Sequence, residues 1–107
     1  MEMNEPKITT DLAADSFAAM GSNARLGVLQ LLVRAGNSGL VVSEIQTQLN
    51  IPPSTLSHHL KFLAAAGLIT QTKTGRTIVV QADYDHLRAL SDFILAACCI
   101  DEKDAVA

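Results

Sequence analysis

Apolar residues recur at helical spacing through the first third of the chain. This pattern predicts one helix that Thr10 or Asp11 caps and that runs through Met20, and a second that Ser22 caps and Gly36 ends. The apolar positions of these two helices are Leu12, Phe17, Met20, Leu26, Leu29, Leu31, Leu32 and Val33. Those of the second helix form a broad apolar face.

Two shorter helices follow a loop that Gly, Asn and Ser residues form at 36–39. The first of them begins near Ser43. The second begins at Pro53, because proline suits the first helical position, where its missing N–H is not needed. It runs to about Ala66 and stops at Gly67.

Strand-like segments replace the helical pattern after residue 67. Residues 68–74 and 77–82 are rich in β-branched side chains and flank Gly75-Arg76, which predicts a hairpin. A last helix is expected over about 84–99. Its apolar stripe comprises Leu87, Leu90, Ile94 and Cys98.

Two short helices joined by a tight turn and followed by a hairpin are typical of a winged helix-turn-helix. The predicted fold is therefore mainly α with a β-hairpin wing (α+β), in the order of four helices, two strands and a final helix. A chain of 107 residues is expected to form one domain over 1–107, with flexible tails at 1–8 and 101–107. Because such a chain buries a modest core, dimerisation would stabilise it.

The distribution of charge changes the functional picture that composition gives. The net charge of −3 and the pI near 5.4 argue against a nucleic-acid binder. Between residues 45 and 82, however, there is no Asp or Glu, and Lys61, Lys73 and Arg76 give a local charge of +3 against −6 elsewhere. Phosphate contact depends on such local charge. One Tyr, three Phe and no Trp are too few to stack single-stranded bases, so duplex DNA is the expected partner.

The fourth predicted helix has one apolar side and one polar side. At about 100° per residue, Leu56, Leu60 and Leu63 fall in a narrow arc that faces the core. The opposite arc carries short donors and acceptors and one cation, which can meet base edges or phosphates in the major groove. The members of this polar arc are Ser54, Thr55, Ser57, His58 and Lys61.

Three other polar residues accompany this helix. Lys73 and Arg76 straddle Gly75 at the tip of the wing, from which they can reach phosphates or the minor groove. His59 falls on the flank of the helix, and we interpret it as a structural, hydrogen-bonding histidine. The alternative for the polar arc is that it forms an ordinary solvated surface without a partner.

Several motifs resemble the ArsR/SmtB family of repressors. Residues 57–69 read SHHLKFLAAAGLI, residues 21–32 read GSNARLGVLQLL, and Gly75-Arg76 matches the family's wing turn. The resemblance spans about residues 12–98. It implies a homodimer that joins through its first and last helices and leaves a pseudo-palindromic operator when an inducer binds.

The sequence departs from this family at several sites. Pro52-Pro53 stands where a cap residue and Gln often occur, so base preference is not carried over. Val-Val-Ser-Glu at 41–44 replaces the Cys-x-Cys of one metalloid-responsive group. Asp85 and His86 are adjacent rather than spaced as in the zinc sensors, and His86 is expected at the surface.

The adjacent Cys98 and Cys99 resemble the C-terminal pair of arsenic- and antimony-responsive members. The resemblance implies a site for trivalent arsenic or antimony, which a close thiol pair can chelate, and no constitutive cofactor. The alternative is that Cys98 packs in the core as a small apolar residue. Two thiols without a third suit a methylated trivalent arsenical, or need a third ligand from elsewhere to bind arsenite.

The chemistry of the last helical turn adds two expectations. The helix C-terminus and nearby acidic side chains should raise the thiol pKa values, which disfavours a reactive redox switch. Adjacent side chains on a helix point about 100° apart, so chelation by both sulfurs is expected to unwind the last turn. The acidic residues concerned are Asp101, Glu102 and Asp104.

Other functional classes fit less well. An enzyme is disfavoured, because no acid between residues 45 and 82 can orient Ser57, His58 or His59 as a triad. Neither a signal peptide nor an apolar run of membrane-spanning length is visible, which predicts a cytoplasmic protein without a membrane partner. A repressor of the same family with another metal, a redox signal or no inducer remains open, as does a winged-helix module that binds protein.

Overall fold

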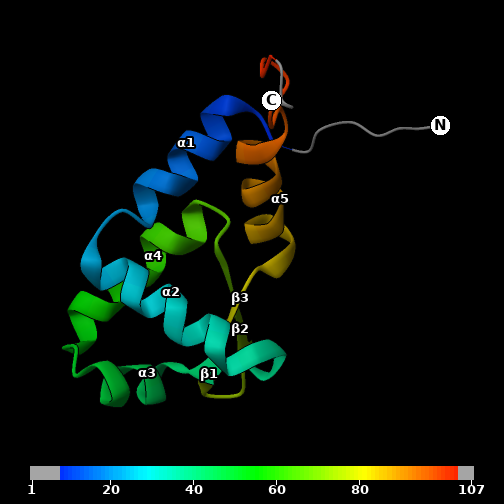
Figure 1. The fold of residues 1–107 in the computed structure, drawn as a ribbon. Helices are drawn as coiled ribbons and strands as arrows, with labels where there is room; N and C mark the ends of the chain where they lie inside the picture. The colour runs from blue at the N-terminus through cyan, green and yellow to red at the C-terminus, as the bar shows by residue number, and fades with distance from the viewer. Residues whose placement is uncertain (1–7, 104–107) are drawn as a thin grey trace.

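A computed structural model describes residues 8–103, which form five α-helices, a short 3-10 helix and a three-stranded antiparallel sheet. The order is α1 (Thr10–Ala19), α2 (Asn23–Ala35), η1 (Gly36–Ser38), β1 (Leu40–Val41), α3 (Val42–Leu49), α4 (Pro53–Ala65), β2 (Ile69–Thr74), β3 (Thr77–Ala82) and α5 (Tyr84–Leu95) (Figure 1). This order confirms the winged helix-turn-helix. Most of the predicted tails, 1–7 and 104–107, lies outside the described residues, while Ile8 is buried in the core.

The first two helices begin with side-chain caps. Thr9 Oγ1 accepts from the N–H of Leu12 at 3.1 Å, so α1 is capped one residue earlier than predicted. Ser22 Oγ caps α2 as predicted, accepting from the N–H of Arg25 at 3.0 Å. Each cap satisfies a backbone donor that the helix itself leaves free.

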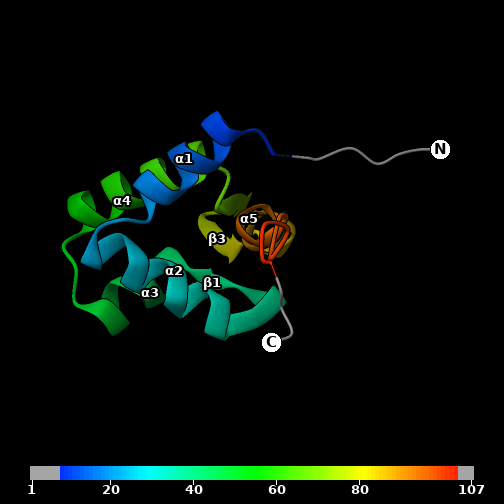
Figure 2. The ribbon, with the colours of Figure 1, turned by 45° about the horizontal axis from the view of Figure 1, so that its top comes forward.

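Two of the three apolar residues predicted for the first helix do not face the core, whereas Met20 packs against it. Leu12 is 52% exposed and Phe17 is 38% exposed, whereas Ala13, Ser16 and Ala19 are buried. The small residues let α1 approach the domain closely, as Figure 2 shows for α1 alongside α4. The large apolar side chains of α1 are consequently left free for another surface.

The core lies between α2, α3, α4 and the sheet. Leu56, Leu60 and Leu63 are at most 3% exposed, which confirms the predicted apolar arc of α4. Other buried side chains of the core are Val28, Leu29, Leu31, Leu32, Ile45, Leu68, Ile69, Val80 and Leu90. On α2, however, Leu26 and Val33 are about two-fifths exposed, so the predicted apolar face was too broad.

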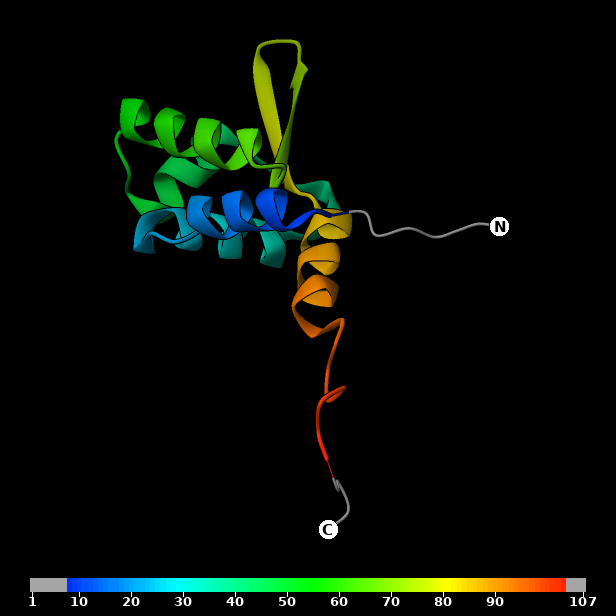
Figure 3. The same cartoon turned by 90° about the horizontal axis from the view of Figure 1, so that it is seen from above.

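The wing is the predicted hairpin with one added strand. Thr74 pairs with Thr77, which leaves Gly75-Arg76 as a two-residue loop with Gly75 at φ 62°. On its other side, β3 pairs with the two residues of β1. The hairpin projects beyond α4, and α5 extends away on the opposite side of the domain (Figure 3).

The last helix ends earlier than the sequence predicts. Asp83 Oδ1 caps α5 by accepting from the N–H of His86 at 3.0 Å, but the α-helix stops at Leu95 rather than near Cys99. The chain continues in turns, in which the N–H of Cys98 donates to Leu95 O at 2.9 Å. No helix within residues 8–103 is long and apolar enough to cross a membrane.

We predict that Gly67→Ala lowers the free energy of unfolding by about 1–2 kcal/mol or more, the cost of a left-handed L-residue. Gly67 has φ 78°, and an added Cβ would also lie 3.3 Å from His86 Nε2. The control is Gly27→Ala, inside α2 with no atom within 4 Å of the new Cβ, which should stabilise by about 0.5–1 kcal/mol. Urea unfolding followed by circular dichroism measures both, and equal effects would contradict this account.

Candidate DNA interface and vicinal thiol pair

The polar arc of α4 lies on the surface. Pro53 occupies the first helical position as predicted, and the N–H of Leu56 donates to Pro52 O at 2.9 Å. Because Leu56, Leu60 and Leu63 fix the buried side, the residues opposite them are held outward. All five of them are exposed: Ser54, Thr55, Ser57, His58 and Lys61.

A cleft of about 550 Å³ separates α4 from the wing. Ser57 and Lys61 line it from α4, and Gln71 and Ile78 line it from the hairpin. Lys73 pairs with Ile78 in the strand register, so both side chains leave the same face of the wing. Lys73 therefore lies on the face of the wing that borders the cleft, whereas Lys61 lines the cleft itself. Gln71 was missed, although its i, i+2 spacing from Lys73 could have identified it.

Arg76 does not join this cleft. It is exposed in the two-residue loop at the far end of the hairpin, where Thr77 Oγ1 donates to Thr74 O at 2.9 Å and braces the turn. The hairpin carries Arg76 beyond α4 (Figure 3). The predicted residues thus form two contact regions, one along α4 and its cleft and one at the tip of the wing.

An aromatic contact that the sequence did not reveal supports His58. The ring of His58 meets the Phe62 ring edge-on, with 4.8 Å between centroids. Arg25 stacks over the same ring at 5.0 Å and donates hydrogen bonds to the carbonyls of Ala18 and Ala19 at the end of α1. Arg25 therefore adds a positive charge beside α4 from a distant part of the chain.

His59 is half-buried on the flank of α4, as its predicted position suggests. Its Nδ1 is buried and has no hydrogen-bond partner among the described residues, so the expected hydrogen bond is not formed at this atom. Burial lowers the pKa of His59, and the nearby charges of Arg25 and His58 lower it further. The neutral imidazole is consequently the favoured form.

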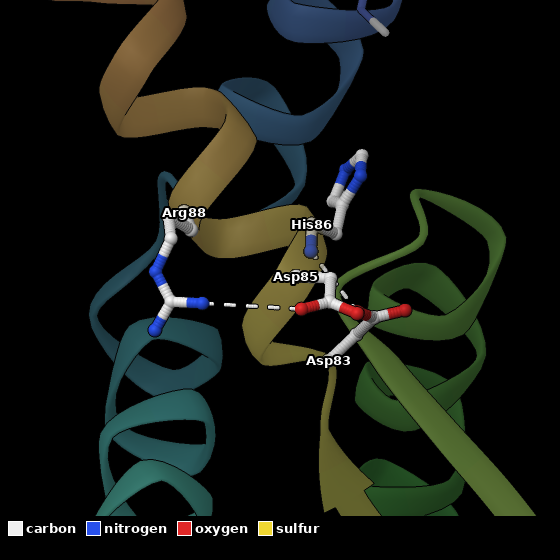
Figure 4. Close-up of polar contacts among 4 residues, drawn as sticks. All are labelled: Asp83, Asp85, His86 and Arg88. Carbon is white, nitrogen blue, oxygen red and sulfur yellow. Dashed lines mark hydrogen bonds and ion pairs between the residues drawn. The ribbon is translucent and has the colours of Figure 1, made fainter.

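His86 is not the surface residue that the sequence predicted. Its Nε2 lies 2.8 Å from Ser16 Oγ, and this hydroxyl donates to Ala66 O at 3.0 Å. The His86 ring points away from the exposed ion pair of Asp85 and Arg88 (Figure 4). In that pair, Arg88 Nη1 lies 3.9 Å from Asp85 Oδ1. Within residues 8–103, no three or more His, Cys, Asp or Glu side chains are grouped to hold a metal ion.

The two thiols converge without any further change of the backbone. Cys98 and Cys99 are both exposed, which contradicts the alternative that Cys98 packs in the core. Their sulfurs are 3.1 Å apart, because the chain has already left the α-helix and Cys99 adopts φ 66°. The last turn is therefore already unwound, whereas the sequence predicted that chelation would unwind it. Two sulfurs this close can bind one soft ion.

The pKa of the Cys99 thiol is raised, as the sequence predicted, but mainly for another reason. The largest cause is its hydrogen bond with Cys98, followed by one with Glu102 and then by burial. Thiolate on Cys99 therefore forms at a higher pH than in an ordinary cysteine. A site of this kind reacts by losing protons as ligand bonds form.

We predict that Cys98→Ala speeds alkylation of Cys99 by iodoacetamide at pH 8. The substitution removes the hydrogen bond that contributes most to the raised pKa, so more thiolate is present at the same pH. The rate is measured by mass spectrometry. Asp101→Asn is the control, because Asp101 is not among the causes of the shift. An unchanged or slower rate in Cys98→Ala would contradict the assignment.

Comparisons with known proteins agree with this geometry. A helix-turn-helix domain model matches residues 20–72, from the end of α1 into β2. An uncharacterized HTH-type transcriptional regulator of Methanocaldococcus jannaschii is 41% identical over 63 residues, which cover 59% of this chain and 68% of that protein. The HTH-type transcriptional repressor SmtB of Mycobacterium tuberculosis is 27% identical over 101 residues, 94% of this chain and 70% of SmtB.

The chain belongs to the ArsR/SmtB family of winged-helix transcriptional regulators. A solved structure of a possible transcriptional regulator for arsenical resistance is 29% identical, with a TM-score of 0.64 over 86% of this chain and 92% of that one. This ArsR/SmtB protein is accordingly a DNA-binding transcriptional regulator and not an enzyme.

Proposed function

We propose that the protein is a homodimeric repressor that trivalent arsenic or antimony releases from a pseudo-palindromic operator. The observation that carries this proposal is the pair of exposed thiols, with Cys98 and Cys99 sulfurs 3.1 Å apart just beyond α5. Two converging soft ligands suit a thiophilic metalloid. The comparisons lend support, since one relative is a repressor and one similar structure is of a possible regulator for arsenical resistance.

The proposed dimer joins through α1 and α5. Both helices expose large apolar side chains that the domain itself does not cover, and α5 extends away from the other helices (Figure 3). Such a patch marks an association surface, and a two-fold interface would pair it with its own copy. Its members are Leu12, Phe17, Ile94, Leu95 and Ile100.

The proposed DNA contacts follow the two regions described above. The N-terminal half of α4 enters the major groove, where Ser54, Thr55, Ser57 and His58 meet base edges or phosphates. Lys61 in the cleft and Lys73 on the adjoining face of the wing contact phosphates, and Arg76 reaches the DNA backbone from the wing tip.

Release follows from the position of the thiols. They lie on the turn that continues α5, and a metalloid bound to both sulfurs replaces the hydrogen bond between them, which alters the segment next to the proposed dimer surface. A changed dimer would move the two copies of α4 out of register with their half-sites. A coupling free energy of about 1–3 kcal/mol suffices for a loss of DNA affinity of about 5- to 150-fold.

We predict that Lys61→Ala reduces the dependence of duplex binding on salt. Each lost phosphate contact reduces the steepness of the plot of log K against log salt by about 0.9. In a dimer, both copies of Lys61 contribute to this change. Fluorescence anisotropy at several salt concentrations measures the slope, and Lys103→Ala is the control because Lys103 lies beyond the thiols. Duplex binding that does not depend on salt would favour a protein-interaction module instead.

We predict that Cys98→Ser and Cys99→Ser each abolish release of operator DNA by arsenite, antimonite and methylarsenite. Each variant should bind DNA within about twofold of the unchanged protein, since neither thiol lies on α4 or the wing. Titration of the complex at fixed salt measures release. A normal response in both variants would reject the thiol site, and a response to none of the three compounds would favour another inducer or none.

A further inference from the structure

Ser16 is buried in an otherwise apolar environment. It is 1% exposed and is the one buried polar side chain in the part of the chain that the structure describes. It lies on the inner face of α1, between Ala13 and Ala19. A hydroxyl in such a place is costly unless it forms hydrogen bonds, and Ser16 forms two.

The two hydrogen bonds of Ser16 have a fixed direction. The hydroxyl has a single proton, which it donates to Ala66 O at 3.0 Å. At His86 Nε2, 2.8 Å away, the same oxygen must therefore accept, so the proton of the imidazole is on Nε2. The chain of donors runs from His86 on α5 through Ser16 on α1 to the residue that ends α4.

The imidazole ring also supports the end of α4 sterically. Gly67 follows Ala66 at φ 78°, and a Cβ there would lie 3.3–3.5 Å from three atoms of the His86 ring. Asp83 holds the same residue from the other side by accepting the backbone N–H of His86 (Figure 4). The position of α5 is therefore linked to the C-terminal end of α4 by hydrogen bonds and by contact.

We propose that Ser16 and His86 are positioning residues that set the orientation of α4 and hence the selectivity of DNA binding. This inference rests on the proposed reading of DNA by α4. A helix of 13 residues spans about 20 Å, so a small tilt at Ala66 displaces the residues near Pro53. Base contacts need accurate geometry, whereas phosphate contacts tolerate displacement. Ser16 and His86 themselves contact no DNA.

The same hydrogen bonds connect α5 with α4. His86 lies in the first turn of α5 and the thiols follow the end of this helix, so the His86–Ser16–Ala66 chain connects the helix that precedes the thiols with the end of α4. Within one protomer, His86 lies against the end of α4 through the Ser16 hydroxyl and the Gly67 backbone. Positioning of α4 and response to an inducer would thus share one connection.

The experiment compares affinity for two duplexes, one selected from a random pool by the unchanged protein and one of unrelated sequence. His86→Gln and His86→Met are a matched pair of similar length, and the Gln amide alone can replace the Nε2–H donor. Ser16→Ala removes the buried hydroxyl, with Ser91→Ala on the exposed side of α5 as its control. Circular dichroism establishes that each variant is folded.

We expect His86→Met and Ser16→Ala to lose about tenfold or more in affinity for the selected duplex. Binding to the unrelated duplex and its salt slope should stay unchanged, whereas partial unfolding would weaken both affinities alike. His86→Gln and Ser91→Ala should retain most of the selectivity. Selectivity within twofold of the unchanged protein in both His86→Met and Ser16→Ala, or equal losses in the Gln and Met variants, would overturn the proposal. No arsenical is used in this experiment. Its outcome is therefore independent of whether arsenite, antimonite or methylarsenite releases the protein from DNA.

Discussion

The structure depends on how the chain leaves α4 at Ala66 and Gly67. Only a residue without a Cβ adopts φ 78° there at little cost and also leaves room for the ring of His86. The N–H of Leu68 then donates to Leu63 O at 3.0 Å, and β2 starts in the direction that the wing requires. Asp83, which follows β3, lies beside this junction, since its N–H donates to Leu68 O at 2.9 Å. The end of α4, the start of the wing and the start of α5 are thereby joined at one point.

This junction separates two surfaces of opposite character. On one side, α4 and the wing expose a polar arc and three cations, in a stretch of sequence without acidic residues. On the other, α5 exposes apolar side chains and leads to the thiols, with Asp101 and Glu102 close by. The acidic net charge of the chain is therefore compatible with DNA binding, because α4 and the wing themselves carry no acidic residue.

The thiol pair shows how a short irregular segment creates chemistry that a regular helix would prevent. In a continued helix, the side chains of Cys98 and Cys99 would diverge by about 100°. The turns after Leu95 bring the sulfurs to 3.1 Å and leave both exposed. Their mutual hydrogen bond keeps Cys99 protonated, which favours a ligand able to displace protons over reaction with an oxidant.

The sequence by itself determined the features that depend on near neighbours: the cap of α2, the arc of Leu56, Leu60 and Leu63, and the hairpin with Gly75. Periodicity and turn chemistry are local, so they can be read from a few successive residues. Only the tertiary structure decided which side of α1 is buried, where α5 ends and what His86 contacts. The contacts of α1 and of His86 depend on partners far along the chain, since His86 lies 70 residues from Ser16. Burial is a property of the assembled layers, and spacing along one helix cannot specify it.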